Sequence, residues 1–298
     1  MFDRILTATD MLGACDAAVV TALEIAKQTK GKLFIMHVLE PSYFHECGPL
    51  EVVKHFKTGD ETAASQEYKD TVKEELDKKC AGALKPYGNY QIDIAYGRPS
   101  IEIRRWARKS GANLIVLGPH AGRVEEEREL IGLRIGNTAE DVIMNTTTPV
   151  MITGSLLPPE KLNFKKIMAC VDFSQSCKYA CEFAVKLAQK YGSKLFLFHM
   201  FSPGGSEKKT ADPEKKIMEF CSMPKGLEHE YSVWDGTDPS VEILKYAREK
   251  EVDLIVMGSC SKDRGTKAYI GSAVDEVSAQ SSCPVIVVTH PDAVLKLG

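Results

Sequence analysis

Short apolar runs alternate with longer amphipathic stretches along the first half of this chain. Four of the apolar runs have the length of a buried strand: 4–9, 32–38, 113–117 and 149–153. Between them, apolar residues recur at helical spacing, which predicts helices at 15–30, 100–109 and 137–145. Apolar strands that alternate with amphipathic helices form parallel sheets with helices on both faces. The pattern therefore predicts an α/β fold.

The same order of elements occurs a second time, with strands predicted at 166–171, 194–200, 253–257 and 284–289. Five blocks of similar sequence recur in one order: 5–10 with 167–172, 32–37 with 194–199, 97–100 with 236–240, 113–118 with 253–258, and 148–152 with 283–287. We interpret the chain as two homologous domains, 1–155 and 160–298, joined by a linker with paired prolines. Extra residues around 60–83 of the first copy predict a solvated amphipathic helix, a lid or packing element.

Composition narrows the class of protein without naming a function. The 298 residues are 44% hydrophobic and 27% charged, with a net charge of −3, which is ordinary for a globular protein. No global positive field favours nucleic acid or an anionic membrane surface, and no apolar run approaches the roughly 20 residues of a membrane helix. Nine cysteines form no disulfide pattern, and the start of the chain has no signal-peptide pattern. We expect a cytoplasmic protein with reduced thiols.

Candidate chemistry lies where the strands of such a sheet end. Open parallel sheets bind ligands beyond the carboxyl ends of their strands, where the strand order reverses. In the second copy this places Asp172, the pair His199-Met200 and Gly258 at one edge. Small residues lead from Gly258 to a helix that we expect to start at Ser272. Such a loop lets a phosphate approach backbone N–H groups, and Ser272 could both cap the helix and donate to a phosphate.

The glycine pattern resembles that of the universal stress protein family, in its tandem two-copy form. The family pattern is a glycine, two residues, a glycine, nine residues and then Gly-Ser or Gly-Thr. Gly258, Ser261 and Gly271-Ser272 fall at this spacing, with Ser261 in the place of the second glycine. The segments 172–174, 236–239 and 283–287 are also similar to the family, so the resemblance covers nearly the whole chain. The Ser261 Cβ would crowd a phosphate or require a backbone angle that glycine adopts more freely.

The resemblance implies a Rossmann-like, adenine nucleotide alpha hydrolase-like fold, with a five-stranded parallel sheet and helices on both faces in each copy. It also implies binding of an adenine nucleotide, ATP with Mg in this reading. Asp172 and the backbone near Val171 and Met200 would hold the adenosine part. The full set of implied nucleotide-binding residues is Cys170, Val171, Asp172, Met200, Met257, Gly258, Ser261, Gly271, Ser272, Ala273 and Val274. The two copies would pair through their last strands as an intramolecular pseudo-dimer, and a further homodimer stays open.

The first copy departs further from the pattern. Gly118 is followed by Pro119, which has no N–H, and the next Gly-x pair arrives late, at Gly136. Between these glycines three arginines stand against four glutamates, whereas between Gly258 and Gly271 three basic residues stand against one aspartate. A triphosphate should therefore prefer the second copy. The first copy is then degenerate, regulatory or specific for a less anionic ligand.

Simpler interpretations stand beside this one. Asp172 could only cap the next helix, the glycines could only serve turns, and His37 and His199 could be hydrogen-bonded structural residues. The Cys177 and Cys181 pair lacks the partners of a zinc site, and no nucleophile–base pair or P-loop is evident. We favour an ATP-binding protein with a sensing or regulatory role. Slow ATP hydrolysis or phosphoryl transfer, and nucleotide-independent binding of an unknown protein partner, remain open as alternatives.

Overall fold

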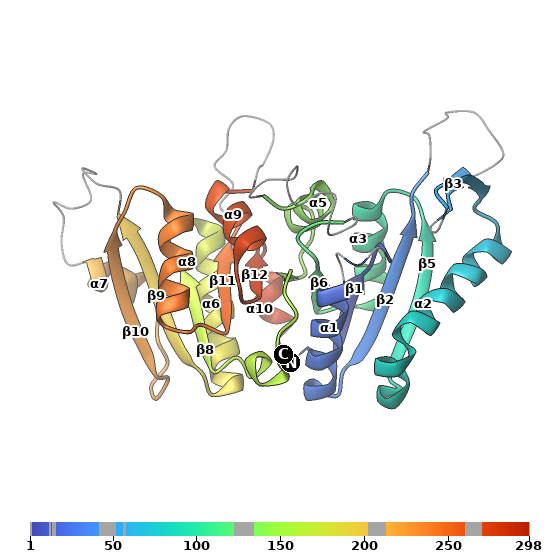
Figure 1. Cartoon of the computed structure of the whole chain (residues 1–298). Helices are drawn as coiled ribbons and strands as arrows, with labels where there is room; N and C mark the ends of the chain where they lie inside the picture. Colours follow the sequence, from blue (N-terminus) through green and yellow to red (C-terminus); the bar gives the residue numbers. More distant parts are fainter. Residues whose placement is uncertain are drawn as a thin grey trace.

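The computed structural model describes residues 2–11, 13, 16–41, 52–55, 58–121, 134–201, 213–259 and 270–297. In this part of the chain, ten strands form one sheet in the order β10-β9-β8-β11-β12-β7-β6-β1-β2-β5 (Figure 1). The first half contributes β1 (Arg4–Ala8), β2 (Lys32–Leu39), β5 (Tyr90–Tyr96), β6 (Leu114–Leu117) and β7 (Val150–Ile152). The second half contributes β8 (Lys166–Cys170), β9 (Lys194–Phe201), β10 (His229–Asp235), β11 (Leu254–Gly258) and β12 (Val285–Val288). In this ten-stranded sheet, all neighbouring strands within one half are parallel.

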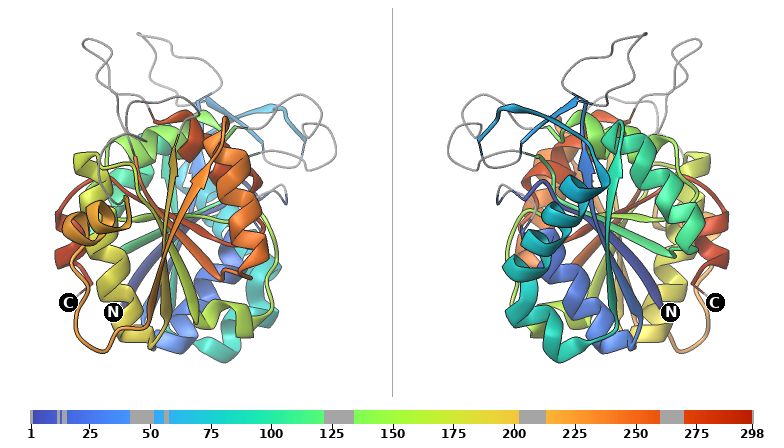
Figure 2. Two further views of the ribbon diagram at one scale, coloured as in Figure 1. Left: turned by 90° about the vertical axis from the view of Figure 1, so that its left-hand side faces the viewer. Right: turned by 90° about the vertical axis from the view of Figure 1, so that its right-hand side faces the viewer.

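Helices cover both faces of this twisted sheet (Figure 2). On one face lie α1 (Asp16–Thr29), α2 (Gln66–Tyr87), α6 (Gln175–Tyr191), α7 (Pro213–Phe220) and α10 (Asp292–Leu295). On the other lie α3 (Pro99–Ser110), α5 (Asn137–Met144), α8 (Pro239–Glu249) and α9 (Ser272–Gln280). The strands are apolar throughout because both faces are buried: Leu254 and Val256 pack into one core, and Ile255 into the other. The predicted α/β fold with a parallel sheet is confirmed.

The two halves meet strand to strand. β7 and β12 are antiparallel, with Met151 opposite Ile286, so two five-stranded parallel sheets form one continuous sheet. The resemblance implied this pairing of the last strands. It removes two exposed strand edges, which would otherwise be sites for pairing with other chains. The connection between the halves includes a 3-10 turn, η1 (Pro159–Asn163), whose Leu162 is fully buried in the core that α1 and α6 share.

The first half carries an antiparallel strand pair that the described part of the second half does not show, and its outer helix α2 is longer than the corresponding α7. The strands β3 (Val52–Lys54) and β4 (Glu61–Ala63) form an antiparallel pair, and α2 follows and packs against β5. The sequence predicted one helix around 60–83. The helix is present, but it begins at Gln66, where the Ser65 hydroxyl caps it by accepting from the Tyr68 N–H at 3.1 Å, and it continues to Tyr87. Residues 61–63 were therefore wrongly placed in this helix.

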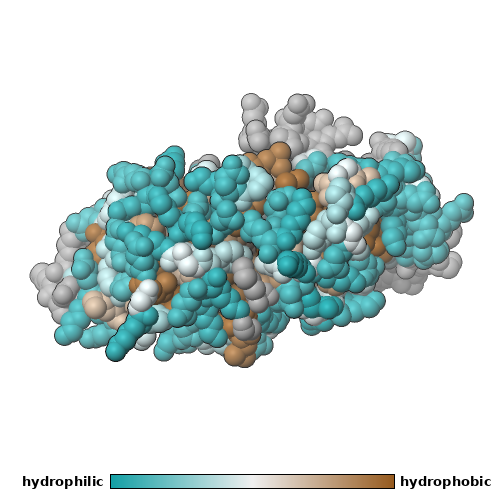
Figure 3. Space-filling model, turned by 90° about the horizontal axis from the view of Figure 1, so that it is seen from below, coloured by the Kyte–Doolittle hydropathy of each residue, from teal (hydrophilic) through white to brown (hydrophobic). Residues whose placement is uncertain are grey.

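The amino ends of the strands lie on the lower surface of the molecule (Figure 1). Seen from below, the molecule is mostly hydrophilic, with small separate apolar patches (Figure 3). None of the helices in the described ranges combines the length and the apolar content that crossing a membrane needs. The loops at the carboxyl ends of the strands lie on the other side, at the top of Figure 1, where α5 and α9 stand next to each other.

Candidate functional site

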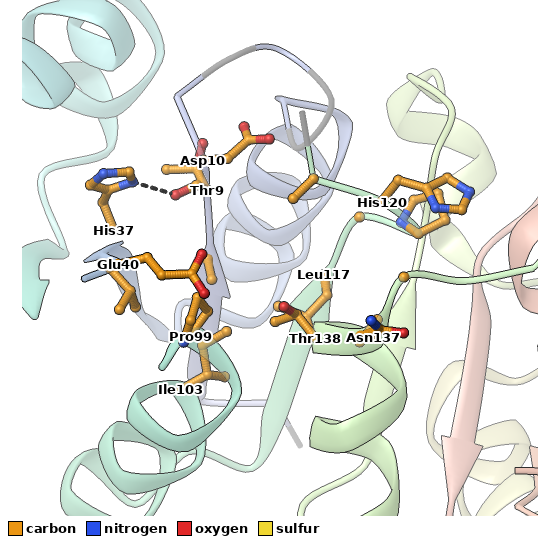
Figure 4. A pocket seen from close by; sticks show the side chains of 17 residues that line it. Thr9, Asp10, His37, Glu40, Pro99, Ile103, Leu117, His120, Asn137 and Thr138 are labelled. Carbon is orange, nitrogen blue, oxygen red and sulfur yellow. Dashed lines mark hydrogen bonds between the residues drawn. The ribbon is translucent and has the colours of Figure 1, made fainter. Parts of the chain in front are cut away.

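A cavity of about 350 Å³ opens at the carboxyl ends of β1, β2 and β6 in the first half (Figure 4). This is the point where the strand order reverses, the position at which open α/β sheets bind ligands. The first turns of α3 and α5 complete its walls. The lining residues are Ala8, Thr9, Asp10, His37, Val38, Glu40, Pro99, Ile103, Leu117, Gly118, Pro119, His120, Ala121, Gly136, Asn137, Thr138 and Ala139.

A buried histidine fixes the loop after the first strand in each half. His37 Nδ1 lies 2.8 Å from the Thr9 carbonyl oxygen, and His199 Nδ1 lies 2.7 Å from that of Val171. Because a carbonyl only accepts, Nδ1–H is the donor in both pairs. Burial lowers the pKa of His37, so its imidazole is neutral at physiological pH. Both residues are therefore the hydrogen-bonded structural histidines of the simpler interpretation.

In the loop after β8, the residue that caps α6 is Ser174. Asp172 accepts a hydrogen bond from the Ser174 N–H at 2.9 Å. Ser174, and not Asp172, caps α6 by accepting from the Cys177 N–H at 3.2 Å. The simpler interpretation, in which Asp172 only caps the next helix, is therefore wrong. Asp172 itself is exposed at the sheet edge, directly after β8.

Gly258 is required by close packing. A Cβ built on it would lie 2.5 Å from the Cys177 backbone nitrogen and 2.6 Å from the Ser176 carbonyl carbon. The first turn of α6 thus rests against the end of β11. Any side chain here would displace the helix that follows the Asp172 loop. The glycine therefore brings two segments of the predicted site together.

The loop after β11 ends at an open helix terminus. The Gly271 N–H donates to the Ser259 carbonyl at 3.0 Å, which brings the two ends of the segment 260–269 together. Gly271 is the N-cap of α9, and no side chain in the described ranges caps this helix. Ser272 is its first helical residue, so its predicted capping role is wrong. In the first half Gly136 likewise precedes α5 and donates to Pro119 at 2.8 Å.

The predicted nucleotide-binding residues lie at one edge of the second half. Cys170, Val171 and Asp172 lie at and after the end of β8; Met200 lies in β9; Met257 and Gly258 end β11; Gly271, Ser272, Ala273 and Val274 begin α9. Met257 and Val274 are core residues, 4% and 3% exposed. Burial raises the pKa of the Cys170 thiol well above its usual range. Ser261 and the basic residues of its loop lie outside the described residues.

A contact between the halves was not found from the sequence. The Asp275 carboxylate on α9 accepts a hydrogen bond from the Ile135 N–H at 2.8 Å and lies 3.6 Å from Arg134 Nε. Burial raises the pKa of Asp275 and of Glu140, which occupies the equivalent position on α5. A groove of about 570 Å³ runs between the two helices. The antiparallel pairing of β7 and β12 brings these residues together.

No metal centre emerges from the described residues. Within these ranges, no three His, Cys, Asp or Glu side chains are grouped so that they could hold a metal ion. The Sγ atoms of Cys177 and Cys181 lie 3.9 Å apart and both thiols are buried. This pair belongs to the core between α6 and the sheet.

The repeated architecture agrees with comparison to known proteins. The model of the universal stress protein family matches residues 1–154 and again residues 163–289. This chain belongs to the universal stress protein family. Among curated members, universal stress protein YxiE of Bacillus subtilis is 28% identical over 147 residues, which are 42% of this chain and 99% of that protein. The family match thus accounts for both halves.

A solved structure has the same fold over nearly the whole chain. A universal stress protein from Archaeoglobus fulgidus matches with a TM-score of 0.67 at 21% identity, covering 97% of both chains. Another universal stress protein of Archaeoglobus fulgidus, solved in complex with dAMP, is 23% identical; it covers 42% of this chain and 98% of its own, with a TM-score of 0.33. The first of these shows that the two-copy sheet also occurs in a second family member.

Proposed function

We propose that this chain is a regulatory nucleotide-binding protein that holds ATP mainly in its second half. The observation that carries the proposal is the open N-terminus of α9, which begins at Gly271 beside the carboxyl end of β11. Because α5 begins in the same way, the preference for the second half rests on the more basic sequence between Gly258 and Gly271. The first N–H groups of a helix carry a partial positive charge and bind phosphate. The adenine preference comes from the family, whose glycine pattern this loop resembles.

In this proposal the residues divide by the part of the nucleotide that they meet. Asp172 and the backbone near Cys170, Val171 and Met200 hold the adenosine part. The phosphates lie against the start of α9 and the end of β11, at Met257, Gly258, Ser261, Gly271, Ser272, Ala273 and Val274. The uncapped start of α9 fits such a ligand. Magnesium would accompany ATP.

We further propose that residues 1–155 and 160–298 act as two coupled domains. Asp275 lies in the first turns of α9, three residues beyond Ser272, and holds the Ile135 N–H of the other half. A phosphate bound at α9 would therefore alter a contact that anchors the loop of the first half. This supports a sensing role in which an unidentified protein partner responds to the altered contact.

Six cysteines of the described chain are free thiols, which supports a reducing, cytoplasmic location.

A matched pair of variants tests the binding site. Ser272→Glu places a carboxylate in the first turn of α9, which a helix N-terminus tolerates and a phosphate does not. Calorimetric titration of the nucleotide-free full chain with Mg-ATP should give about one site per chain, and Ser272→Glu should weaken it about tenfold or more. Asn137→Glu, at the equivalent exposed position of α5, should leave that site unchanged.

Two outcomes would contradict the proposal. One is the absence of any binding heat up to millimolar Mg-ATP. The other is an equal loss of affinity in Ser272→Glu and Asn137→Glu, which would mean that the halves bind ATP alike. Thermal unfolding of both variants checks that they remain folded.

A further inference from the structure

We infer that the cavity of the first half binds an adenine nucleoside without phosphate groups, and that Glu40 selects this ligand. The inference rests on the proposed function for its adenine preference, and it assigns the first half a ligand class of its own. The cavity measures about 350 Å³, at the lower end of the roughly 300–1,000 Å³ typical of small-molecule sites. Val38, Ile103 and Leu117 give it apolar walls suited to a flat base.

The side-chain charge of the lining disfavours a phosphate and opposes the partial positive charge of the uncapped start of α5, which also lines the cavity. Asp10 and Glu40 contribute two carboxylates, and the lining residues in the described part of the chain include no lysine or arginine. His37 adds no positive charge, because burial keeps its imidazole neutral. Negative groups in a partly enclosed cavity repel an anionic ligand and attract hydrogen-bond donors. A nucleoside offers hydroxyl and amino donors without a phosphate charge.

Glu40 stands where it can meet such donors. Figure 4 shows its carboxylate above Pro99, turned toward the interior of the cavity. The two oxygens of one carboxylate can accept from the two neighbouring hydroxyls of a ribose, the contact that acidic residues make in other α/β nucleotide sites. Counted from the histidine that both copies share, Glu40 corresponds to Ser202 in the second copy. The acidic group is thus particular to the first half.

The added elements of the first half hold Glu40 in place. Leu39, on one side of it, is 2% exposed and packs with Val53 of β3 and Val72 of α2. Pro41, on the other side, forms an antiparallel bridge with Val53. The Leu39 carbonyl also accepts from the Gly97 N–H at 3.1 Å. The strand β3 and the helix α2 therefore fix the backbone on both sides of Glu40.

The test is a titration of the full chain with adenosine while Mg-ATP saturates the second half. We expect about one adenosine site per chain, with 2′-deoxyadenosine at least about tenfold weaker, the scale of one hydrogen bond to a charged group. Glu40→Ser should remove most of this difference between the two nucleosides. It should also raise the number of Mg-ATP sites toward two per chain. A merely structural role of Glu40 would change neither the 2′-hydroxyl preference nor the ATP stoichiometry.

The controls separate this inference from the proposed function. Glu74→Gln removes one exposed carboxylate from α2 of the same half and should leave adenosine binding unchanged. Glu40→Gln, with an amide in place of the charge, should admit AMP to the first half while keeping part of the nucleoside affinity. If Mg-ATP binds at one site and adenosine does not bind, the inference is overturned and the proposed function stands. If wild-type protein takes two equivalent ATP molecules, both are overturned.

Discussion

The two halves share one framework and differ in the side chains placed on it. In both, a buried histidine donates to the carbonyl after the first strand, and a glycine N–H closes the loop before a helix without a side-chain cap. The halves diverge at Glu40 and at Pro119 against Ser259. Their described residues also differ in the strands β3 and β4 and in the outer helix, which is long in α2 and short in α7. The backbone of a site can therefore be duplicated while its ligand preference is set by a few residues at the rim.

Close packing at the strand end provides the most severe test of this comparison. Gly258→Ala places a methyl group 2.5 Å from the Cys177 nitrogen, so α6 must move or β11 must bend. We expect a loss of about 2–3 kcal/mol in the free energy of unfolding, the usual cost of overpacking. Gly136→Ala, just before the first turn of α5, is a comparison change at a glycine of the first half where an added methyl group has room. Its nearest atom would be the Pro119 oxygen at 3.6 Å, an ordinary contact, and we expect a loss of about 1 kcal/mol or less.

Urea unfolding of both variants, followed by far-UV circular dichroism, compares the two glycines directly. Equal losses would mean that contact with α6 does not decide the cost of a side chain at Gly258. In that case the close packing of β11 against the first turn of α6 would not hold the Asp172 loop in place. Binding of Mg-ATP to Gly258→Ala should also weaken. The Asp172 loop leads directly into α6, so a shift of this helix would move the loop.

The contact between the halves should respond to pH. Burial raises the pKa of Asp275 in the folded chain above its value in the unfolded chain. Protonation of this group therefore favours folding at low pH, and this contribution is lost as the pH rises through the folded pKa. Asp275→Asn keeps an oxygen acceptor for the Ile135 N–H but has no titration. Relative to this variant, wild type should gain stability as the pH falls from 7 to 4, within about 1 kcal/mol.

The neighbours of Asp275 define the controls. Arg134, Glu276 and His120 all contribute to its local charge. Burial also raises the pKa of Glu140, the equivalent carboxylate on α5. Relative to Glu140→Gln, wild type should therefore also gain stability as the pH falls. Urea midpoints of wild type and both variants across this range measure the effect. Parallel curves for wild type and Asp275→Asn would show that this carboxylate does not titrate differently on folding.

Much of this architecture is legible in the sequence because it follows from burial. The apolar strands, the repeat and the glycine-to-helix loop all reflect backbone packing, which leaves a periodic pattern. The fifth strands, β5 and β10, escaped detection because they lie at the outer edges of the sheet and are only partly buried. Their sequences mix polar and apolar residues, as edge strands do.

The parts of the site that the sequence left unpredicted depend on distant contacts. Glu40 reads as an ordinary charged residue until β3 and α2 are seen to hold its neighbours. Asp275 reads as a helical surface residue until the antiparallel pairing of β7 and β12 brings α5 beside α9. The caps of α6 and α9 were misassigned by one or two residues, since serine, aspartate and glycine all suit that position.

The smallest expected effect concerns the contacts that Lys79 of α2 makes with the loop after β1. Lys79 Nζ donates to Asp16 at 3.0 Å and to the Met11 carbonyl at 3.3 Å. In the second half the shorter α7 meets the equivalent loop differently, with Lys216 Nζ 4.1 Å from the centre of the Phe173 ring. Both partners of the ion pair between Lys79 and Asp16 are partly exposed, so Lys79→Met should cost about 0.5 kcal/mol or less in stability. Its local consequence should be larger, because Met11 directly follows Asp10 in the cavity lining. Hydrogen exchange should speed up at the amides of residues 9–11 and stay unchanged at 171–173, the equivalent loop of the second half. If the variant changes exchange at residues 9–11 no more than at 171–173, α2 does not stabilise the loop that carries Asp10. In that case β1 and His37 hold this side of the cavity.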